Sequence, residues 1–198
     1  MTSDDERTAI GARAPQVLIQ SRAEWRVWLA AHHDEYRAIW LVSYKKHTGR
    51  PRMEYGDLVD EALCFGWIDS SVRALDDDRA MNYVSRRKKG SIWSRSNKER
   101  IERLVATGLM TPAGQVLIDA AKADGSWTSY DAVEDLAVAP DLLAALEADP
   151  IAADNFAAFA PTAKKPLLWW VYSAKTAATR EARIAELVGM AHDNRKTR

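Results

Sequence analysis

The chain has 198 residues, of which 47% are hydrophobic and 28% are charged, a composition typical of a globular protein with one domain or one domain and an appended subdomain. Its 28 basic residues balance its 28 acidic ones, so no net charge attracts it to nucleic acid or to an anionic membrane. The single cysteine excludes an intrachain disulfide, and the absence of any apolar run of about 18 residues argues against membrane insertion.

The first residues of the chain are polar and partly acidic, and they lack the apolar segment typical of a secretory signal. We therefore expect a disordered tail at residues 1–15 and a cytoplasmic protein. The rest of the chain, residues 16–194, is expected to form a single globular domain. It divides into an α+β half at 16–110 and a helical half at 111–194.

Helix and strand patterns alternate at the start of the first half. Ser21 followed by Glu24 forms a capping box, which predicts a helix from this point. Residues 39–46 are rich in β-branched and aromatic side chains and predict a strand. Apolar residues at helical spacing over 55–65 predict a helix that ends at Gly66.

The next segments predict a hairpin and another helix. Residues 67–73 and 80–85 have the pattern of two short strands, and the three aspartates at 76–78 predict the turn between them. A second capping box, formed by Ser96 and Glu99, predicts a helix that begins there.

The second half carries helix start signals at Thr111-Pro112, at Pro140, at Asp149-Pro150 and at Thr162, and apolar residues at helical spacing over 184–191. In all we expect about seven or eight helices and three or four short strands, without the alternating rhythm of a parallel α/β fold. The fold class is therefore predicted to be α+β, mainly helical, with a small antiparallel sheet of three or four short strands in the N-terminal half.

Polar and aromatic side chains that can carry chemistry are densest between residues 40 and 97. We predict a small ligand-binding hollow there, in which one of two adjacent arginines folds back onto a carboxylate and two tryptophans form walls. The expected binding residues are Lys45, Glu61, Trp67, Asp69, Arg86, Arg87, Trp93 and Asn97. The ligand would be a charged or amide-bearing small molecule or peptide. The alternative explanation is an ion-pair network that holds the hairpin to the preceding helix.

Motifs of the common enzyme classes are missing. The chain has no glycine-rich phosphate loop, no dinucleotide fingerprint, no paired-cysteine motif and no nucleophile elbow. His32 and His33 are adjacent, and adjacent side chains on a helix diverge by about 100°. We therefore predict no metal site and no cofactor. Cys64 lies in an apolar run, which favours a small buried side chain over a reactive thiol.

Residues 79–103 contain nine basic and two acidic side chains. Basic side chains bind phosphates and aromatic rings stack on bases, so this block supports a nucleic-acid hypothesis. The balanced total charge and the absence of a nucleic-acid-binding motif argue against it. Residues 131–154 contain seven acidic and no basic side chains, and this block could pack on the basic one or on a protein partner.

Five stretches resemble successive blocks of the bacteriocin-protection family, also described as YdeI or OmpD-associated. In chain order they are YKKHTG, EALCFGWIDS, SRRKKGSIWSRSNKER, LMTPAG and WWVYSAKTAATREARI. The resemblance spans roughly residues 21–192. It implies a link to protection against bacteriocins or antimicrobial peptides and to an outer-membrane porin, and it carries over no catalytic residue. Members often have glycine where this chain has Ser70.

Three functional hypotheses follow from these observations. The first is a non-enzymatic cytoplasmic binding or stress-protection factor that uses the predicted hollow. The second is a small-molecule enzyme in which Asp69 or Glu61 is the general base and an arginine holds an anion, and it requires a carboxyl pKa raised toward neutrality. The third is a nucleic-acid binder that uses residues 79–103, which the charge balance disfavours.

Overall fold

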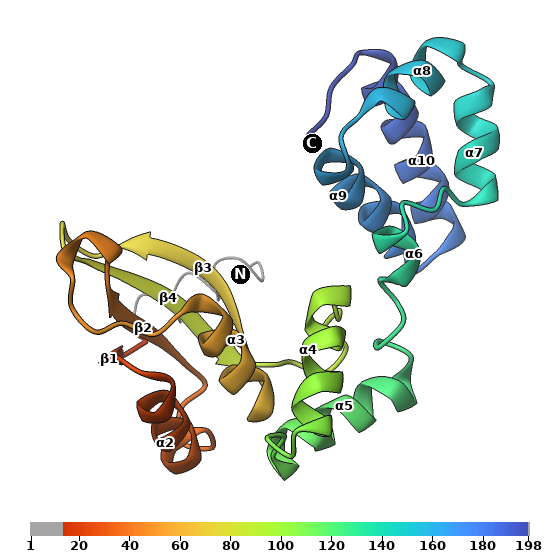
Figure 1. Cartoon of the computed structure of the whole chain (residues 1–198). Coiled ribbons are helices and arrows are strands. Elements are labelled where there is room, and N and C mark those ends of the chain that lie inside the picture. Colours follow the sequence, from red (N-terminus) through yellow and green to blue (C-terminus); the bar gives the residue numbers. More distant parts are fainter. Residues whose placement is uncertain (1–13, 198) are drawn as a thin grey trace. The chain divides into compact units, whose positions relative to one another are not determined.

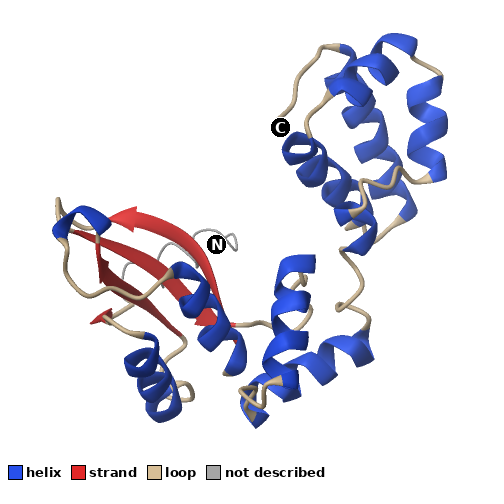
Figure 2. Ribbon diagram, viewed as in Figure 1, coloured by secondary structure: helices blue, strands red, loops and turns tan. Residues whose placement is uncertain are grey.

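The structure is a computed structural model and describes residues 14–197. The chain divides between Trp127 and Thr128 into two compact units (Figure 1), and each has its own hydrophobic core. The disordered tail expected at residues 1–15 lies, apart from its last two residues, outside the described residues. All strands of the described residues belong to the first unit, and the second unit contains helices only (Figure 2).

The first unit contains a four-stranded sheet with the order β1-β2-β4-β3. The strands are β1 (Gln16–Leu18), β2 (Ala38–Tyr44), β3 (Trp67–Ala74) and β4 (Arg79–Arg86). The expected α+β class is confirmed, and so is the hairpin of β3 and β4. The sheet is mixed, however, because β1 pairs with β2 in parallel. A three-residue strand leaves too little pattern to predict, and the connection through a helix makes the parallel pairing possible.

That helix is α2 (Arg22–His32), and Ser21 caps it as predicted by accepting a hydrogen bond from the backbone N–H of Glu24. The next helix is α3 (Tyr55–Cys64), preceded by a 3₁₀ turn, η1 (Lys46–Thr48). Both α2 and α3 contribute to the first core, together with the inward residues of β2, Ile39 and Leu41. The alternation of a strand directs Trp40 and Val42 to the opposite sheet face.

Two more helices complete the first unit, α4 (Arg95–Ala106) and α5 (Pro112–Asp124). The prediction that Ser96 caps α4 is wrong, because Ser94 is the extended residue whose hydroxyl accepts the first-turn N–H. The expected division after residue 110 puts α5 with the helical half. Its residues Ile118 and Ala121 lie in the first core, so the boundary between the units follows α5 instead of preceding it.

The second unit consists of α6 (Asp131–Glu134), α7 (Pro140–Glu147), α8 (Pro150–Ala158), α9 (Pro161–Tyr172) and α10 (Ala177–His192). The expected starts at Pro140 and Pro150 are confirmed. The predicted cap at Thr162 is wrong, since Ala160 precedes the first helical residue, Pro161, whose fixed φ suits that position. No helix of residues 14–197 is long and apolar enough to cross a membrane.

Candidate functional site

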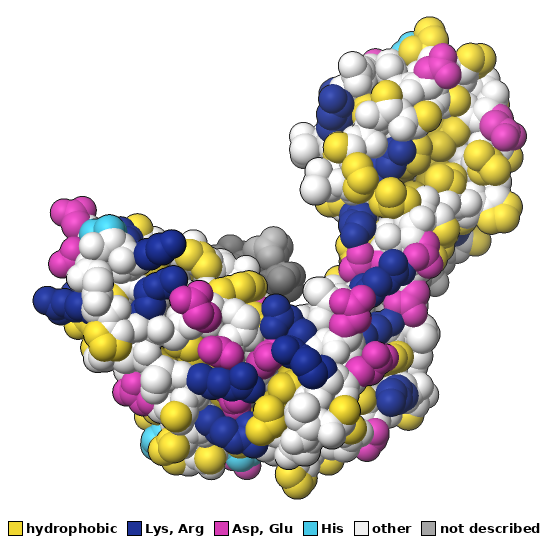
Figure 3. All heavy atoms as spheres, in the orientation of Figure 1, with side chains coloured by type: hydrophobic (Ala, Val, Ile, Leu, Met, Phe, Trp, Pro, Cys, Tyr) yellow, Lys and Arg dark blue, Asp and Glu magenta, His cyan; other side chains and the backbone are white. Residues whose placement is uncertain are grey.

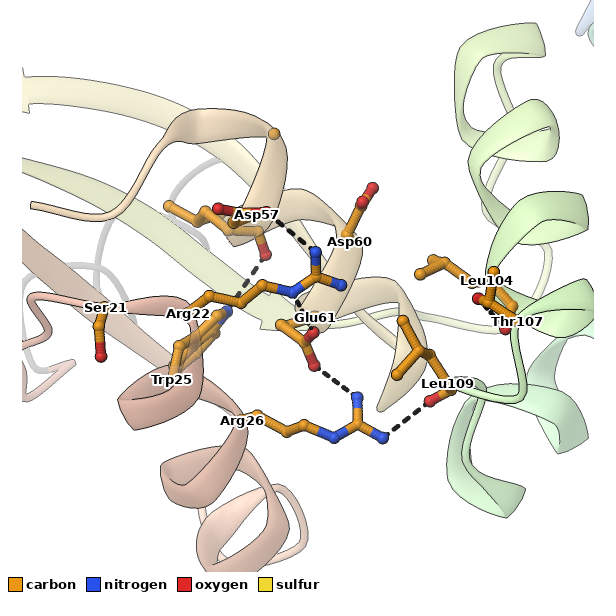
Figure 4. Close-up of polar contacts among 12 residues, drawn as sticks. Ser21, Arg22, Trp25, Arg26, Asp57, Asp60, Glu61, Leu104, Thr107 and Leu109 are labelled. Atoms are coloured by element: carbon orange, nitrogen blue, oxygen red, sulfur yellow. Dashed lines mark hydrogen bonds and ion pairs between the residues drawn. The ribbon is translucent and has the colours of Figure 1, made fainter.

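Two adjacent carboxylates on α3 are buried and paired with arginines. Glu61 is 1% exposed, and its two oxygens accept hydrogen bonds from Arg22 Nε at 2.7 Å and from Arg26 Nη1 at 2.6 Å (Figure 4). Asp60 is bound in the same way by Arg100 Nη1 at 2.6 Å and by Arg103 Nη2 at 2.7 Å. These contacts form what we call the arginine clamp, in which α3 is fixed to α2 on one side and to α4 on the other.

The clamp accounts for Glu61 as a structural residue. Both of its oxygens accept hydrogen bonds from guanidinium groups, and the side chain is buried, so it is not presented to a ligand. Its partners come from α2, and neither Arg86 nor Arg87 reaches it. The alternative of an ion-pair network therefore describes Glu61 well, although the network joins α3 to another helix and not to the hairpin.

Three other residues predicted to bind the ligand are engaged in the packing and hydrogen bonding of the fold instead. Trp67 is fully buried, and its ring meets Trp28 edge to face at 6.0 Å. Arg86 donates from Nε to the backbone oxygen of Tyr36 at 2.8 Å. Lys45 donates to a backbone oxygen of the β3–β4 turn, at the end of the sheet opposite Arg86.

Three of the four remaining predicted residues line one hollow of about 430 Å³, which we call the Arg87 cavity. Its walls come from α3, β3, the segment after β4 and the first turns of α4. The lining residues are Tyr55, Val59, Ile68, Asp69, Arg87, Ile92, Ser94, Ser96, Asn97 and Arg100. Three of the predicted residues thus line one hollow, and Trp93 lies directly behind one of them.

A β-bulge places Asp69 on this cavity. Asp69 pairs with Val84 and Ser71 pairs with Tyr83, so Ser70 is the extra residue of the bulge. Bulges bend a strand and redirect the neighbouring side chain. One carboxylate oxygen of Asp69 accepts a hydrogen bond from the Tyr55 hydroxyl at 2.8 Å. Partial burial, and then this hydrogen bond, raise the pKa of Tyr55.

Arg87 is the most unusual group of the cavity, because it is a buried cation. The residue is 8% exposed, and its guanidinium stacks on the Trp93 ring, 3.5 Å from the ring centre. Nη1 donates to the backbone oxygen of Ile92 at 3.1 Å, whereas Nε is buried without a partner. Burial lowers the pKa of Arg87 to about 10, and the negative charge of Asp69 opposes that shift.

The start of α4 supplies further donors. The Ser94 hydroxyl caps the helix, and it lies 3.1 Å from the Ser96 hydroxyl. The partial positive charge of a helix N-terminus favours anions. Arg100 lines the same hollow while its Nη1 binds Asp60 and the backbone oxygen of Gly56. The cavity is therefore cationic on the α4 side and carries one carboxylate on the β3 side.

Sequence reasoning missed Tyr55, Ser94, Ser96 and Arg100 as lining residues. A helix start after Ser94 would have indicated the serines, but the choice of Ser96 as the cap placed that start two residues late. Tyr55 approaches Asp69 only through the packing of α3 on the hairpin, which no local pattern predicts.

Three arginines of the basic block at 79–103 form ion pairs within the first unit. Arg79 pairs with Asp76, and Arg100 and Arg103 pair with Asp60. On the face seen in Figure 3, Lys and Arg side chains lie among Asp and Glu over α3 and α4. Within residues 14–197, no three His, Cys, Asp or Glu side chains converge in a way that could hold a metal ion.

Comparison with known families divides the chain in a similar way to the structure. A domain of unknown function, DUF8412, matches residues 17–117, about half of the chain. The bacteriocin-protection, YdeI or OmpD-associated family matches residues 135–194, so four of the five stretches noted above fall within the first match and one within the second. Comparison with curated proteins and with solved structures gave no match. The chain therefore belongs to the DUF8412 family, whose model matches residues of its first unit, and residues 135–194 of its second unit match the model of the bacteriocin-protection, YdeI or OmpD-associated family.

Proposed function

We propose that the protein is a non-enzymatic binding factor that holds a small molecule or a short peptide in the Arg87 cavity through an anionic group of the ligand. The observation that carries the proposal is the buried guanidinium of Arg87. Burying a cation is costly unless a partner compensates it, and this one has a single hydrogen bond to a backbone oxygen. An anionic ligand would supply the missing acceptors.

The surroundings of Arg87 support this assignment. Ser96 and Asn97 line the same hollow at the start of α4, where the helix dipole favours negative charge. The ring of Trp93 holds the guanidinium flat, so its orientation is fixed before a ligand arrives. Such preorganisation lowers the entropy lost on binding.

The enzymatic alternative is weaker and rests on Asp69 alone. Both oxygens of Glu61 are bound by arginines, which argues against it as a general base. Asp69 lines the cavity, but one of its oxygens already accepts from Tyr55. The nucleic-acid alternative loses support for a similar reason, since three arginines of the basic block, Arg79, Arg100 and Arg103, pair with carboxylates of the same unit.

A cytoplasmic stress-protection role remains part of the proposal. The free and buried Cys64 suits a reducing compartment. The cavity lies in the first unit, outside the residues matched by the bacteriocin-protection family. The family's description therefore says nothing about what the cavity binds, and the second unit would carry any protection role that the family name implies, with a protein partner as one possibility.

Native mass spectrometry of the full chain, purified gently from its own host, tests the binding proposal. Arg87→Met removes the guanidinium but keeps an apolar stem against Trp93. Arg79→Met, at the β3–β4 turn, is the matched control because it removes an exposed arginine outside the cavity. We expect an added mass on the wild type and on the control, and none on Arg87→Met. An added mass that persists on Arg87→Met, or none on any of the three proteins, contradicts the proposal.

A further inference from the structure

The Arg87 cavity carries two opposite charges that do not neutralise each other. Arg87 and Asp69 both line it, yet they form no direct ion pair. Asp69 also acts electrostatically on Arg87. Because both side chains border the same hollow without pairing, a ligand that carries both charges could bind each of them there.

On the negative side of the cavity, the carboxylate of Asp69 is held in place by a hydrogen bond to only one of its two oxygens. The Tyr55 hydroxyl occupies one oxygen at 2.8 Å, and the other oxygen has no donor among the described residues. The adjoining bulge fixes the strand at this point. An oriented carboxylate with a free oxygen is a good acceptor for an ammonium group, since charge-assisted hydrogen bonds are about twice as strong as neutral ones.

On the positive side, several donors converge. The guanidinium of Arg87 has one hydrogen bond, through Nη1, and its buried Nε has none. Asn97 and Ser96 lie beside it at the N-terminus of α4, a helix of 12 residues. Guanidinium and amide donors next to a helix N-terminus match the geometry of a carboxylate.

From this pairing of charges we infer that the ligand is a zwitterion, a free amino acid or a dipeptide, whose ammonium group binds Asp69 and whose carboxylate binds Arg87. The inference rests on the proposed function and narrows its ligand class. The cavity volume of about 430 Å³ lies at the lower end of the range for small-molecule sites, about 300 to 1,000 Å³, which suits a molecule of this size.

The test is an isothermal calorimetric titration of the full chain with the twenty amino acids and a set of dipeptides. Each compound is used in three forms: free, N-acetylated and C-amidated. Acetylation removes the ammonium charge, and amidation removes the carboxylate. The proteins are wild type, Asp69→Asn and Arg87→Met, with Asp77→Asn as a matched control because Asp77 lies in the β3–β4 turn, outside this cavity.

We expect at least one free compound to bind wild type with a Kd at least about tenfold lower than either blocked form, the scale of one charge-assisted hydrogen bond. Asp69→Asn should lose the preference for the free over the acetylated form, and Arg87→Met the preference for the free over the amidated form. Asp77→Asn should behave as wild type. The separate arms for amino acids and dipeptides identify which of the two is the ligand.

Other outcomes separate this inference from the proposed function. If acetylated and free forms bind equally and Asp69→Asn changes nothing, the zwitterion is excluded while anion binding at Arg87 stands. If no form binds wild type, the zwitterion is also excluded. Native mass spectrometry of the purified protein then tests the proposed function independently, because it detects a bound molecule of any chemical class.

Discussion

Asp60 and Glu61 are neighbours on α3, yet they bind arginines of two different helices. Glu61 takes both of its partners from α2, and Asp60 takes both from α4. Adjacent side chains on a helix point about 100° apart, and this divergence allows one short helix to hold two neighbours. Since Arg100 both binds Asp60 and lines the Arg87 cavity, the clamp also fixes one wall of that cavity.

The first prediction concerns the stability that the clamp provides. Glu61→Gln leaves Arg26 without its carboxylate partner and leaves Arg22 with Asp57 alone, and breaking a buried pair from one side costs about 3 to 5 kcal/mol. The arginines are 37% and 34% exposed, so water recovers part of this cost. We expect the free energy of unfolding to fall by about 2 to 3 kcal/mol, measured by urea denaturation.

Glu54→Gln is the matched control for this variant. Glu54 immediately precedes α3 and pairs with Arg52, but its side chain is 70% exposed, and exposed pairs contribute about 1 kcal/mol or less. Equal losses in Glu54→Gln and Glu61→Gln would show that burial of the carboxylate is irrelevant, contrary to the clamp.

The second prediction concerns the contact between α5 and the end of α3. A Cβ on Gly114 would meet the backbone oxygens of Leu63 and Cys64, the former at 2.7 Å. Backbone cannot move aside as a side chain can, so Gly114→Ala should lower the free energy of unfolding by at least about 2 kcal/mol. Gly189→Ala, where a Cβ meets nothing within 4 Å inside α10, should instead raise it by about 0.5 to 1 kcal/mol. Thermal unfolding followed by circular dichroism distinguishes the two signs, and a neutral Gly114→Ala would contradict this packing.

Elements with a strong local signal were predicted well. The capping box at Ser21, the hairpin and the helix that ends at Gly66 all depend on residues within a few positions of each other. The strand β1 and the assignment of α5 to the first unit were not predictable in this way. Both are decided by packing between distant segments, which leaves no periodic pattern in the sequence.

The candidate site was likewise predictable only in part. The composition of residues 40–97 indicated that Asp69, Arg87 and Asn97 lie near one another, and the structure places them around one cavity. It also suggested Glu61 and Trp67, which are part of the core. A carboxylate that binds a ligand and one that binds arginines look alike in sequence, because the difference lies in which helix faces it.

A third prediction follows from the burial of Cys64. The residue has no exposed surface, and burial, with the nearby charge of Glu61, raises the pKa of its thiol to about 11. At pH 8 the thiol is therefore protonated and shielded, and the reactive thiolate is scarce. We expect a disulfide reagent such as Ellman's reagent to label the native protein at least about a hundredfold more slowly than the urea-unfolded chain. Rapid labelling of the native protein would mean that the end of α3 opens readily.

The last prediction concerns the pH dependence of stability and the ion pair between Asp141 and Arg180, which joins α7 to α10. Arg180 binds both oxygens of Asp141, with Nη2 2.8 Å from Oδ1. The hydrogen bond from Arg180 lowers the pKa of Asp141 to about 2, whereas an unfolded aspartate titrates near about 3.9. A depressed folded pKa adds stability above the unfolded value, and this stability is lost as the pH falls through the folded one.

The wild type should therefore lose more stability between pH 4 and pH 2 than Asp141→Asn does, and the two should show parallel pH profiles above about pH 5. The Asp141 side chain is 48% exposed, so solvent screening keeps the difference below about 1 kcal/mol. Asp154→Asn serves as the control, because this exposed carboxylate of α8 has no ion pair among the described residues. Melting temperatures of the three proteins across this range measure the effect. If Asp141→Asn and Asp154→Asn follow the same curve, the pair with Arg180 does not stabilise the second unit in solution.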